Sequence, residues 1–189
     1  MKLITISGLD GSGKSTQIEL LKEYLNSKNK KFFYFHAIEF SLANKITTKK
    51  SSDSKSVAKA NFFQIILRRI FLMIDLFRFK RLLKKLEKQE FDYLVSDRYF
   101  YDSIINIYYL SKKDKRIPCE KFISKPAVAV YLDADPEMIM QRERKPDQGM
   151  EYLQKKKELY DAKFSSWNMK KIDGNQEKEE IFKEIRNLI

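Results

Sequence analysis

Glycine, cysteine and histidine are scarce in this chain of 189 residues, which has five, one and one of them. A lone cysteine, Cys119, forms no internal disulfide bond, so a disulfide-stabilised scaffold is excluded. The chain also lacks the roughly 20 uninterrupted apolar residues of a membrane-spanning helix, because its most apolar stretch (62–77) holds three charged residues. The first ten residues contain too short an apolar run for a secretory signal. We therefore expect a cytoplasmic protein without a membrane span.

Acidic residues are outnumbered, since 38 Lys and Arg against 26 Asp and Glu give a formal net charge of +12. Most of this excess is lysine spread along expected helices, as in 84–88 and 154–160, and such runs usually form solvated faces. We therefore expect no nucleic-acid partner. In the alternative interpretation the charge is functional, and the chain is a nucleotide-binding module or an ATPase that acts on nucleic acid.

Short apolar strands alternate with helical stretches along the chain. Strands are expected at 3–7, 31–35, 92–97, 127–134 and 168–173. The first helix is indicated by Ile18, Leu21 and Leu25, and further helices are expected at 55–88, 100–111, 136–144, 151–164 and 177–189. Polar, turn-rich surface loops are expected at 47–56, 112–118 and 144–149. This alternation predicts a three-layer α/β fold, with a parallel sheet of about five strands between helices, in one domain over residues 1–189.

Three of the five glycines fall within six positions, between the first expected strand and the first expected helix. Gly8, Gly13, Lys14 and Ser15 fit the pattern G-x-x-x-x-G-K-[ST] of a P-loop. Glycine lets the backbone take positive φ and brings bare amides close to an anion, while the lysine adds charge at the outer phosphates. The hydroxyl of Ser15 can reach Mg²⁺. The predicted ATP-binding residues are Gly8, Asp10, Gly11, Ser12, Gly13, Lys14, Ser15 and Thr16.

An aspartate and an arginine follow the third expected strand. A P-loop needs a carboxylate near the metal, usually at the carboxyl end of a neighbouring parallel strand, and Asp97 is in that place. We therefore predict that Ser15 and Asp97 bind Mg²⁺. Arg98 beside them can hold an acceptor phosphate through two hydrogen bonds or neutralise charge in the transition state. Lys14, Asp97 and Arg98 are thus candidate catalytic residues.

GLDGSGKST (8–16), DRY (97–99), YLDADPEMIMQRER (131–144) and a later Tyr160 together resemble the thymidylate kinases. The resemblance implies a P-loop fold in which ATP donates its γ-phosphoryl group to a deoxynucleoside monophosphate, most closely dTMP, with Mg²⁺. It also implies a homodimer formed through long helices.

By the same motif matching, Asp10 contacts the acceptor's sugar hydroxyl, Arg98 holds the acceptor phosphate, and Tyr99 lies with them at the acceptor site. For Asp10, simple turn chemistry is an equal alternative.

Such kinases close a lid over the phosphates, which the resemblance places at about residues 141–152. One subgroup has a catalytic arginine inside the P-loop, but this chain has Gly11 there, so the lid must supply the charge. Arg142, Arg144 and Lys145 are the candidates. Arginines two apart on a helix do not share a face, so we expect one to point inward and favour Arg142 over two solvated arginines.

The chain departs from the family where the acceptor base would bind. Family members pair an aromatic ring with an arginine about four residues later, whereas Phe71 is followed by Asp75 here. A carboxylate accepts from an amino group but does not donate to a thymine carbonyl. In the alternative, Phe71 belongs to the core and Asp75 to the helix surface. Glu39 is expected near the sugar and phosphate, or equally on the surface.

A second resemblance, to the deoxynucleoside kinases, rests on FFQ (62–64) and DQGMEYLQKK (147–156). These enzymes phosphorylate the unphosphorylated nucleoside. The DRY triplet favours the monophosphate kinases.

Overall fold

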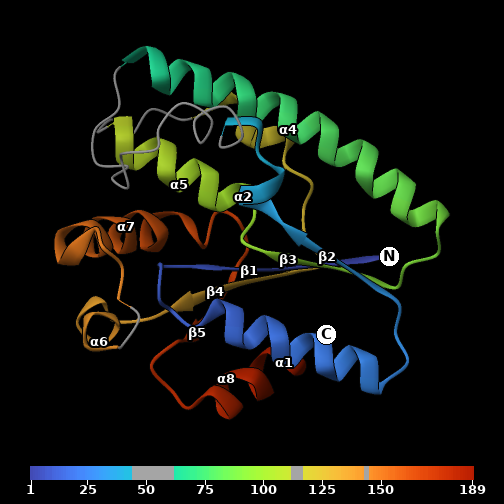
Figure 1. The fold of residues 1–189 in the computed structure, drawn as a ribbon. Coiled ribbons are helices and arrows are strands. Elements are labelled where there is room, and N and C mark those ends of the chain that lie inside the picture. Colours follow the sequence, from blue (N-terminus) through green and yellow to red (C-terminus); the bar gives the residue numbers. More distant parts are fainter. Residues whose placement is uncertain (44–61, 112–116, 143–144) are drawn as a thin grey trace.

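The computed structural model describes residues 1–43, 62–111, 117–142 and 145–189 of the chain. One parallel sheet has the strand order β2-β3-β1-β4-β5 and lies between helices (Figure 1). Its strands are β1 (Lys2–Gly8), β2 (Phe32–His36), β3 (Tyr93–Asp97), β4 (Val128–Asp133) and β5 (Lys170–Asp173). Every pairing between neighbours is parallel. The expected α/β fold with about five parallel strands is therefore confirmed.

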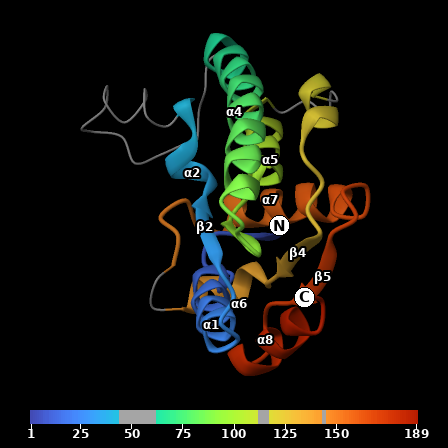
Figure 2. The ribbon, with the colours of Figure 1, turned by 90° about the vertical axis from the view of Figure 1, so that its right-hand side faces the viewer.

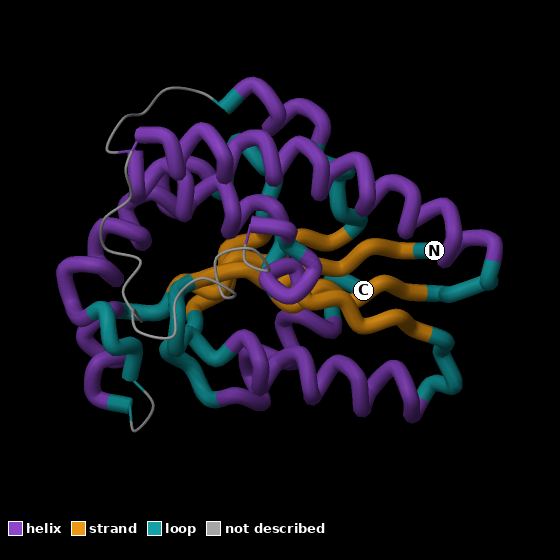
Figure 3. Tube along the Cα trace, turned by 45° about the horizontal axis from the view of Figure 1, so that its top comes forward, coloured by secondary structure: helices purple, strands orange, loops and turns teal. Residues whose placement is uncertain are grey.

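Two groups of helices enclose the sheet, as the turned ribbon of Figure 2 and the tube of Figure 3 show. One face is covered by α1 (Lys14–Ser27) and α8 (Lys178–Arg186). The other face is covered by α4 (Phe62–Lys88), α5 (Phe100–Ser111) and α7 (Gly149–Lys163). Three short elements complete the described part: α2 (Ala37–Phe40), the 3-10 turn η1 (Pro118–Phe122) and α6 (Pro136–Gln141). No described helix is both long and apolar enough to span a bilayer.

Each face of the sheet has its own apolar core. On the α1 side, Ile4 and Ile6 of β1 join a buried aliphatic cluster that includes Leu21 and Ile185. On the other side, large aromatic rings fill much of the space between the sheet and the helices: Phe79, Tyr99, Tyr131 and Tyr160. Strands covered on both faces are expected to be apolar throughout, and six of the seven residues of β1 are buried.

The strand order places a crevice at the carboxyl ends of β1 and β3. From β1 the chain continues into α1 on one face, and from β3 it continues into α5 on the opposite face. Ligands of open α/β sheets bind at such a switch point, outside the carboxyl ends of the strands. In the parallel pairing of β1 with β3, Ile6 lies beside Asp97. The P-loop begins at Gly8, two residues after Ile6, so it lies close to Asp97 at the same edge of the sheet.

Several expected helices have different ends in the structure. α4 begins at Phe62, and residues 55–61 of the expected helix lie outside the described residues. α6 ends at Gln141, because Arg142 takes an extended conformation with ψ of 151°. α7 begins two residues early, at Gly149. The sequence patterns did not indicate α2 and η1, because four or five residues are too few to show helical periodicity.

Candidate functional site

The P-loop is built from glycines in conformations that side chains rarely adopt. Gly8, Gly11 and Gly13 have φ of 151°, 83° and 97°. A Cβ atom on Gly8 would lie 2.6 Å from the carbonyl oxygen of Leu132 on β4, so this position also needs glycine for space. Gly13 is the residue before α1, whose unpaired amides and dipole point at the loop. The local sequence therefore gives this loop a backbone conformation suited to binding an anion.

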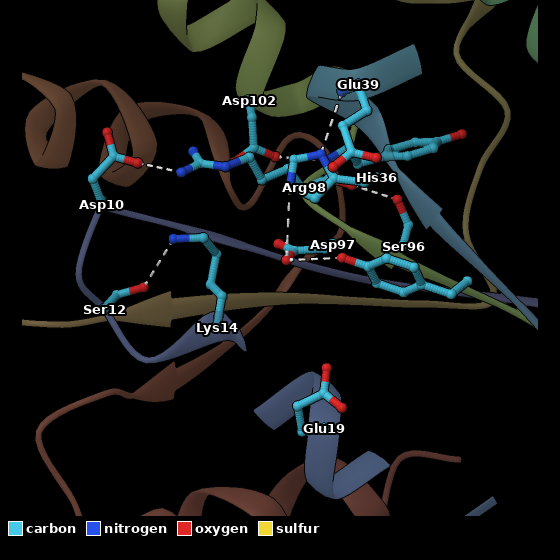
Figure 4. Close-up of polar contacts among 12 residues, drawn as sticks. Asp10, Ser12, Lys14, Glu19, His36, Glu39, Ser96, Asp97, Arg98 and Asp102 are labelled. Atoms are coloured by element: carbon cyan, nitrogen blue, oxygen red, sulfur yellow. Dashed lines mark hydrogen bonds and ion pairs between the residues drawn. The ribbon is translucent and has the colours of Figure 1, made fainter. Parts of the chain in front are cut away.

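The side chain of Lys14 folds back under this loop and is only 5% exposed. Its Nζ donates to the carbonyl of Leu9 at 2.5 Å and to Oγ of Ser12 at 3.4 Å, the contact drawn in Figure 4. Burial lowers the pKa of Lys14 to about 8, and the positive charge of Arg98 adds to the fall. An ammonium group held in so little water gains strongly from an incoming polyphosphate.

Asp97 ends β3 and is 7% exposed. Its Oδ2 accepts from the Tyr34 hydroxyl at 3.4 Å and lies 4.0 Å from Nε2 of His36, both on β2 (Figure 4). Among the described residues no Lys or Arg forms an ion pair with this carboxylate, so its charge is available to a cation.

The donor set at the P-loop fits Mg²⁺ held mainly by a nucleotide. No group of three or more His, Cys, Asp or Glu in the described ranges could hold a metal ion by itself. Mg²⁺ commonly takes one or two protein oxygens and fills its other positions with phosphates and water. The Asp97 carboxylate and the hydroxyl of the exposed Ser15 are donors of that type.

Arg98 and Asp10 form a partly buried ion pair at the mouth of the crevice. Arg98 Nη2 donates to Asp10 Oδ1 (Figure 4), and Tyr152 of α7 donates its hydroxyl to Asp10 Oδ2 at 2.8 Å. Burial raises the pKa of Asp10, but Arg98, Lys156 and Lys14 outweigh it and hold that pKa well below its ordinary value. Burial likewise lowers the pKa of Arg98, and the carboxylates of Asp10 and Asp102 outweigh it. Both groups are therefore charged at neutral pH.

The backbone at Arg98 is strained in a way that aims this side chain. Arg98 has φ of 61°, which is uncommon for a residue other than glycine. The conformation is held by Arg98 N–H donating to the Ile6 carbonyl at 3.1 Å, and by the Ser96 hydroxyl donating to the Arg98 carbonyl. Such outliers cluster at functional sites.

A polar network beneath the ion pair was missed by the sequence analysis. Asp102 is 4% exposed and accepts from the Ser7 hydroxyl at 2.6 Å, the Tyr99 N–H at 2.8 Å and the Tyr160 hydroxyl at 2.7 Å. Lys156 of α7 is also 4% exposed, and the carboxylates of Asp10 and Asp102 act on it.

The prediction that the lysines of 154–160 form a solvated face is therefore wrong for Lys156. Its Nζ lies 4.7 Å from the centre of the Tyr152 ring. Burial lowers its pKa to about 8. Neither an acid in the first turn of a helix, as Asp102 is, nor one lysine of a basic run has a local pattern that would have indicated this network.

A cleft continues from Arg98 between α2, α4 and α5. Tyr99 lines it, as expected of an acceptor-site residue, but its hydroxyl donates to the carbonyl of Ser124 at 2.7 Å. On α4 the residue at the cleft is Leu72, whereas Phe71 is half-buried and does not line it. The contact of Phe71 with an acceptor base thus has no support from the lining of this cleft.

Asp75 also lines the cleft, and it is neither a surface residue nor a free acceptor. It is 2% exposed. Its Oδ2 accepts from the Leu42 N–H at 3.1 Å, and its Oδ1 accepts from Arg78 Nη1 at 2.5 Å. Asp75 therefore ties the segment after α2 to α4.

The remaining predicted residues lie around the P-loop and at α2. Arg142 donates through Nη1 to the Gly11 carbonyl and through Nη2 to the Gly174 carbonyl at 3.3 Å, so it rests on the loop. Arg144 lies outside the described residues. Glu39 is exposed on α2, and its N–H donates to Nδ1 of His36 (Figure 4). Thr16 is exposed in the first turn of α1.

The structure thus brings Lys14, Asp97, Arg98 and Asp10 to one crevice, with an anion cradle on one side and a cleft on the other. This arrangement can hold a polyphosphate against a second anion while the cations and a metal neutralise charge. Phosphoryl transfer needs these conditions and little else from a protein.

Comparison with known proteins gives a consistent result. The family model for thymidylate kinase matches residues 6–185. A probable thymidylate kinase of Saccharolobus solfataricus is 28% identical over 196 residues, which cover 100% of this chain and 96% of that protein. Another, of Methanosphaera stadtmanae, is also 28% identical and covers 98% of this chain and 96% of its own. The solved thymidylate kinase of Candida albicans has a TM-score of 0.70 at 18% identity, over 100% of this chain and 90% of that one.

Proposed function

The chain belongs to the thymidylate kinase family, and from that premise we propose that it transfers the γ-phosphoryl group of ATP to dTMP, giving dTDP and ADP. We assign this activity to a single kinase domain over residues 1–189. The observation that carries the proposal is the partly buried Arg98 beside the P-loop, held by Asp10 and lining the crevice. A simple ATPase has no need of this second anion site.

The donor side of the reaction falls to the P-loop. The loop amides and Lys14 would bind the β- and γ-phosphates, while Ser15 and Asp97 would hold Mg²⁺. When bound, the ion would supply positive charge that neutralises the phosphates. Arg142, already on the loop, would contribute a further positive charge near the transferred group.

The acceptor side falls to Arg98, whose five N–H donors match a phosphate. A 5′-phosphate oxygen of dTMP forms the new bond to the γ-phosphorus as the bond to the β,γ-bridging oxygen breaks. Monophosphate oxygens are ionised at neutral pH, so the step needs no added general base. Asp10 orients Arg98 and would accept a hydrogen bond from the acceptor's sugar, with Glu39 and Tyr99 close by.

The test is a panel of acceptors with ATP and Mg²⁺, in which dTMP, thymidine and no acceptor are compared by nucleotide chromatography. The proposal predicts dTDP from dTMP, no dTMP from thymidine, and slow ATP turnover without an acceptor. Phosphorylation of thymidine alone would instead establish a deoxynucleoside kinase. Turnover stimulated by DNA or RNA and independent of dTMP would establish an ATPase that acts on nucleic acid.

We further propose that the enzyme is a homodimer and works in the cytoplasm, where ATP and deoxynucleotides occur. The support for a dimer is an apolar stripe on α4 that is largely exposed, with only Phe77 near another described ring, that of Phe122. Its side chains are 36% to 79% exposed: Phe62, Phe63, Ile66, Ile70, Ile74 and Phe77. Light scattering should give a dimer for the native chain and a monomer for Ile70→Glu, whereas Lys84→Glu on an exposed position of α4 serves as the control.

A further inference from the structure

One face of α7 carries three buried polar side chains that meet the two acids of the site. Tyr152, Lys156 and Tyr160 are spaced four residues apart, so they lie on the same face of the helix. They are 7%, 4% and 1% exposed. Tyr152 donates its hydroxyl to Asp10, and Tyr160 donates its hydroxyl to Asp102. Lys156 therefore lies between the two tyrosines that hold these carboxylates.

Lys156 acts on both carboxylates through space. In the part of the chain that the structure describes, its Nζ donates no hydrogen bond, and it lies 4.7 Å from the centre of the Tyr152 ring. Asp10 and Asp102 attract its charge, but burial disfavours the charged form more strongly and lowers the pKa to about 8. The ammonium group thus costs the free enzyme stability. A buried charge that the fold does not need is a candidate for a role in function.

Four charged groups meet in this acid cluster: Asp10, Asp102, Arg98 and Lys156. Two negative charges and two positive charges make the cluster neutral. Arg98 and Asp102 both line the cleft, and Arg98 donates through Nη2 to Asp10. Without Lys156 the cluster would carry a net negative charge. That charge would repel an incoming phosphate and would hold Arg98 more tightly to the acids.

We propose that Lys156 is a positioning residue of the acceptor site, whose charge balances Asp10 and Asp102 and so leaves Arg98 free to bind the acceptor phosphate. The proposal rests on the proposed function, since it takes dTMP as the acceptor and Arg98 as the contact of its phosphate. Lys156 need not touch the acceptor. It acts by attracting the phosphate and by weakening the hold of the acids on Arg98.

The experiment measures kcat, the KM for dTMP and the KM for ATP in the native enzyme and in Lys156→Met at pH 7. Lys156→Met should raise the KM for dTMP about 10-fold, which is the size that attraction between one charge and a phosphate gives in a partly hydrated interior. It should leave kcat and the KM for ATP within about threefold of native, because the P-loop keeps its own cation.

A double variant, Lys156→Met with Asp102→Asn, tests whether the charge balance is the cause. The asparagine keeps an oxygen for the Ser7 hydroxyl and the Tyr99 N–H, which both donate to Asp102 in the native protein. One acid and one cation then remain, so the cluster is neutral again. The KM for dTMP should therefore return to within about threefold of native.

A pH profile gives an independent readout at saturating ATP and Mg²⁺. Lys156 loses its charge as the pH rises through about 8, so the ratio of the KM of Lys156→Met to that of native should fall from about 10 at pH 7 toward 1 at pH 9.5. The pKa of Asp10 is lowered, and those of Arg98 and the two tyrosines of α7 are raised, so these neighbours keep their charge across this window. Lys14 also has a pKa of about 8, but it is present in both proteins and cancels in the ratio.

Two further variants serve as controls. Lys155→Met removes the neighbouring exposed lysine of α7, which pairs with Glu151, and should leave the KM for dTMP within about twofold of native. Lys156→Gln is a polar, uncharged variant that should show the same rise in KM if Lys156→Met fails to fold. Thermal melting of each variant reports folding separately.

A KM for dTMP that stays within twofold of native in Lys156→Met overturns the role of Lys156, and the proposed function then stands. A double variant weaker than Lys156→Met also overturns it, because substitutions that only disturb packing do not compensate one another. So does a KM ratio that is constant with pH. A native enzyme that phosphorylates no dTMP shows instead that the proposed function is wrong, and the role of Lys156 toward an acceptor phosphate falls with it.

Discussion

Replacing Lys14 by methionine should lower activity severely and yet make the free enzyme more stable. The pKa of Lys14 falls from its ordinary 10.5 to about 8, so the folded free enzyme disfavours the ammonium by roughly 3 kcal/mol. Methionine keeps much of the apolar stem without the charge. The variant loses the hydrogen bond to the Leu9 carbonyl, and this loss offsets about 1 kcal/mol of the gain in stability.

At pH 7 the free energy of unfolding of Lys14→Met should therefore exceed the native value by about 2 kcal/mol. For a chain of this size that raises Tm by roughly 4–8 °C. The same change should lower kcat by about 1,000-fold, because the charge at the transferred phosphoryl group is lost. Urea unfolding and steady-state kinetics measure the two effects, and Lys28→Met at the exposed end of α1 should change stability by less than about 0.5 kcal/mol.

The difference in the free energy of unfolding between Lys14→Met and the native protein should also depend on pH, in a defined direction. Between about pH 8 and 10.5 the unfolded chain still binds a proton at residue 14 that the folded native chain has released. Stability of the native protein, relative to Lys14→Met, therefore rises across this window by about 1.4 kcal/mol per pH unit, so the two become equally stable at about pH 9.5 and the native protein is the more stable above it. Lys156 has a similarly lowered pKa, but it is present in both proteins and cancels. A Lys14→Met variant less stable than native at pH 7, or a difference that does not vary with pH, would refute the reasoning.

Three further predictions follow from contacts in the site. Arg98→Ala should raise the KM for dTMP about 100-fold or more and change the KM for ATP less than about threefold, because it removes a charged partner of the acceptor phosphate alone; the opposite pattern in initial-rate kinetics would assign Arg98 to ATP. Gly8→Ala should destabilise the fold by at least about 2 kcal/mol in urea unfolding, since its Cβ would meet the Leu132 carbonyl at 2.6 Å, and native-like stability would show that the loop moves freely. Tyr152→Phe should cost about 1 kcal/mol of stability and raise the KM for dTMP several-fold through loss of the hydrogen bond to Asp10, with an unchanged KM counting against a role for Asp10 at the acceptor.

The fold and the phosphate loop could be predicted from the sequence because their signals are local. Gly8, Gly13, Lys14 and Ser15 stand at fixed spacing. The two glycine positions need a backbone conformation that other residues rarely adopt, and the next two positions need a positive charge and a hydroxyl group. The strands β1, β3 and β4 could be predicted for a similar reason, since a strand buried on both faces is a short, largely apolar run. Asp97 was found because the carboxyl end of a strand beside β1 is a defined place in this topology.

The rest of the site comes from residues that only the tertiary structure brings together. Tyr152 and Asp10 are 142 positions apart, and nothing in the basic helical run around Lys156 marks one lysine as buried. Asp75 offered two interpretations from sequence, yet its bonds to Leu42 and Arg78 match neither. Side-chain partners of this kind depend on how helices pack, which periodicity alone does not specify.

The most direct test of the account uses a compound in which adenosine and thymidine are joined by five phosphates, and measures its affinity by calorimetry with Mg²⁺. If the P-loop and the cleft beyond Arg98 face one another as donor and acceptor sites, the compound should bind at least about 100-fold more tightly than ATP. Both Lys14→Met and Arg98→Ala should then weaken binding of this compound, whereas only Lys14→Met should weaken binding of ATP. Binding no tighter than that of ATP, and insensitive to Arg98→Ala, would contradict the account.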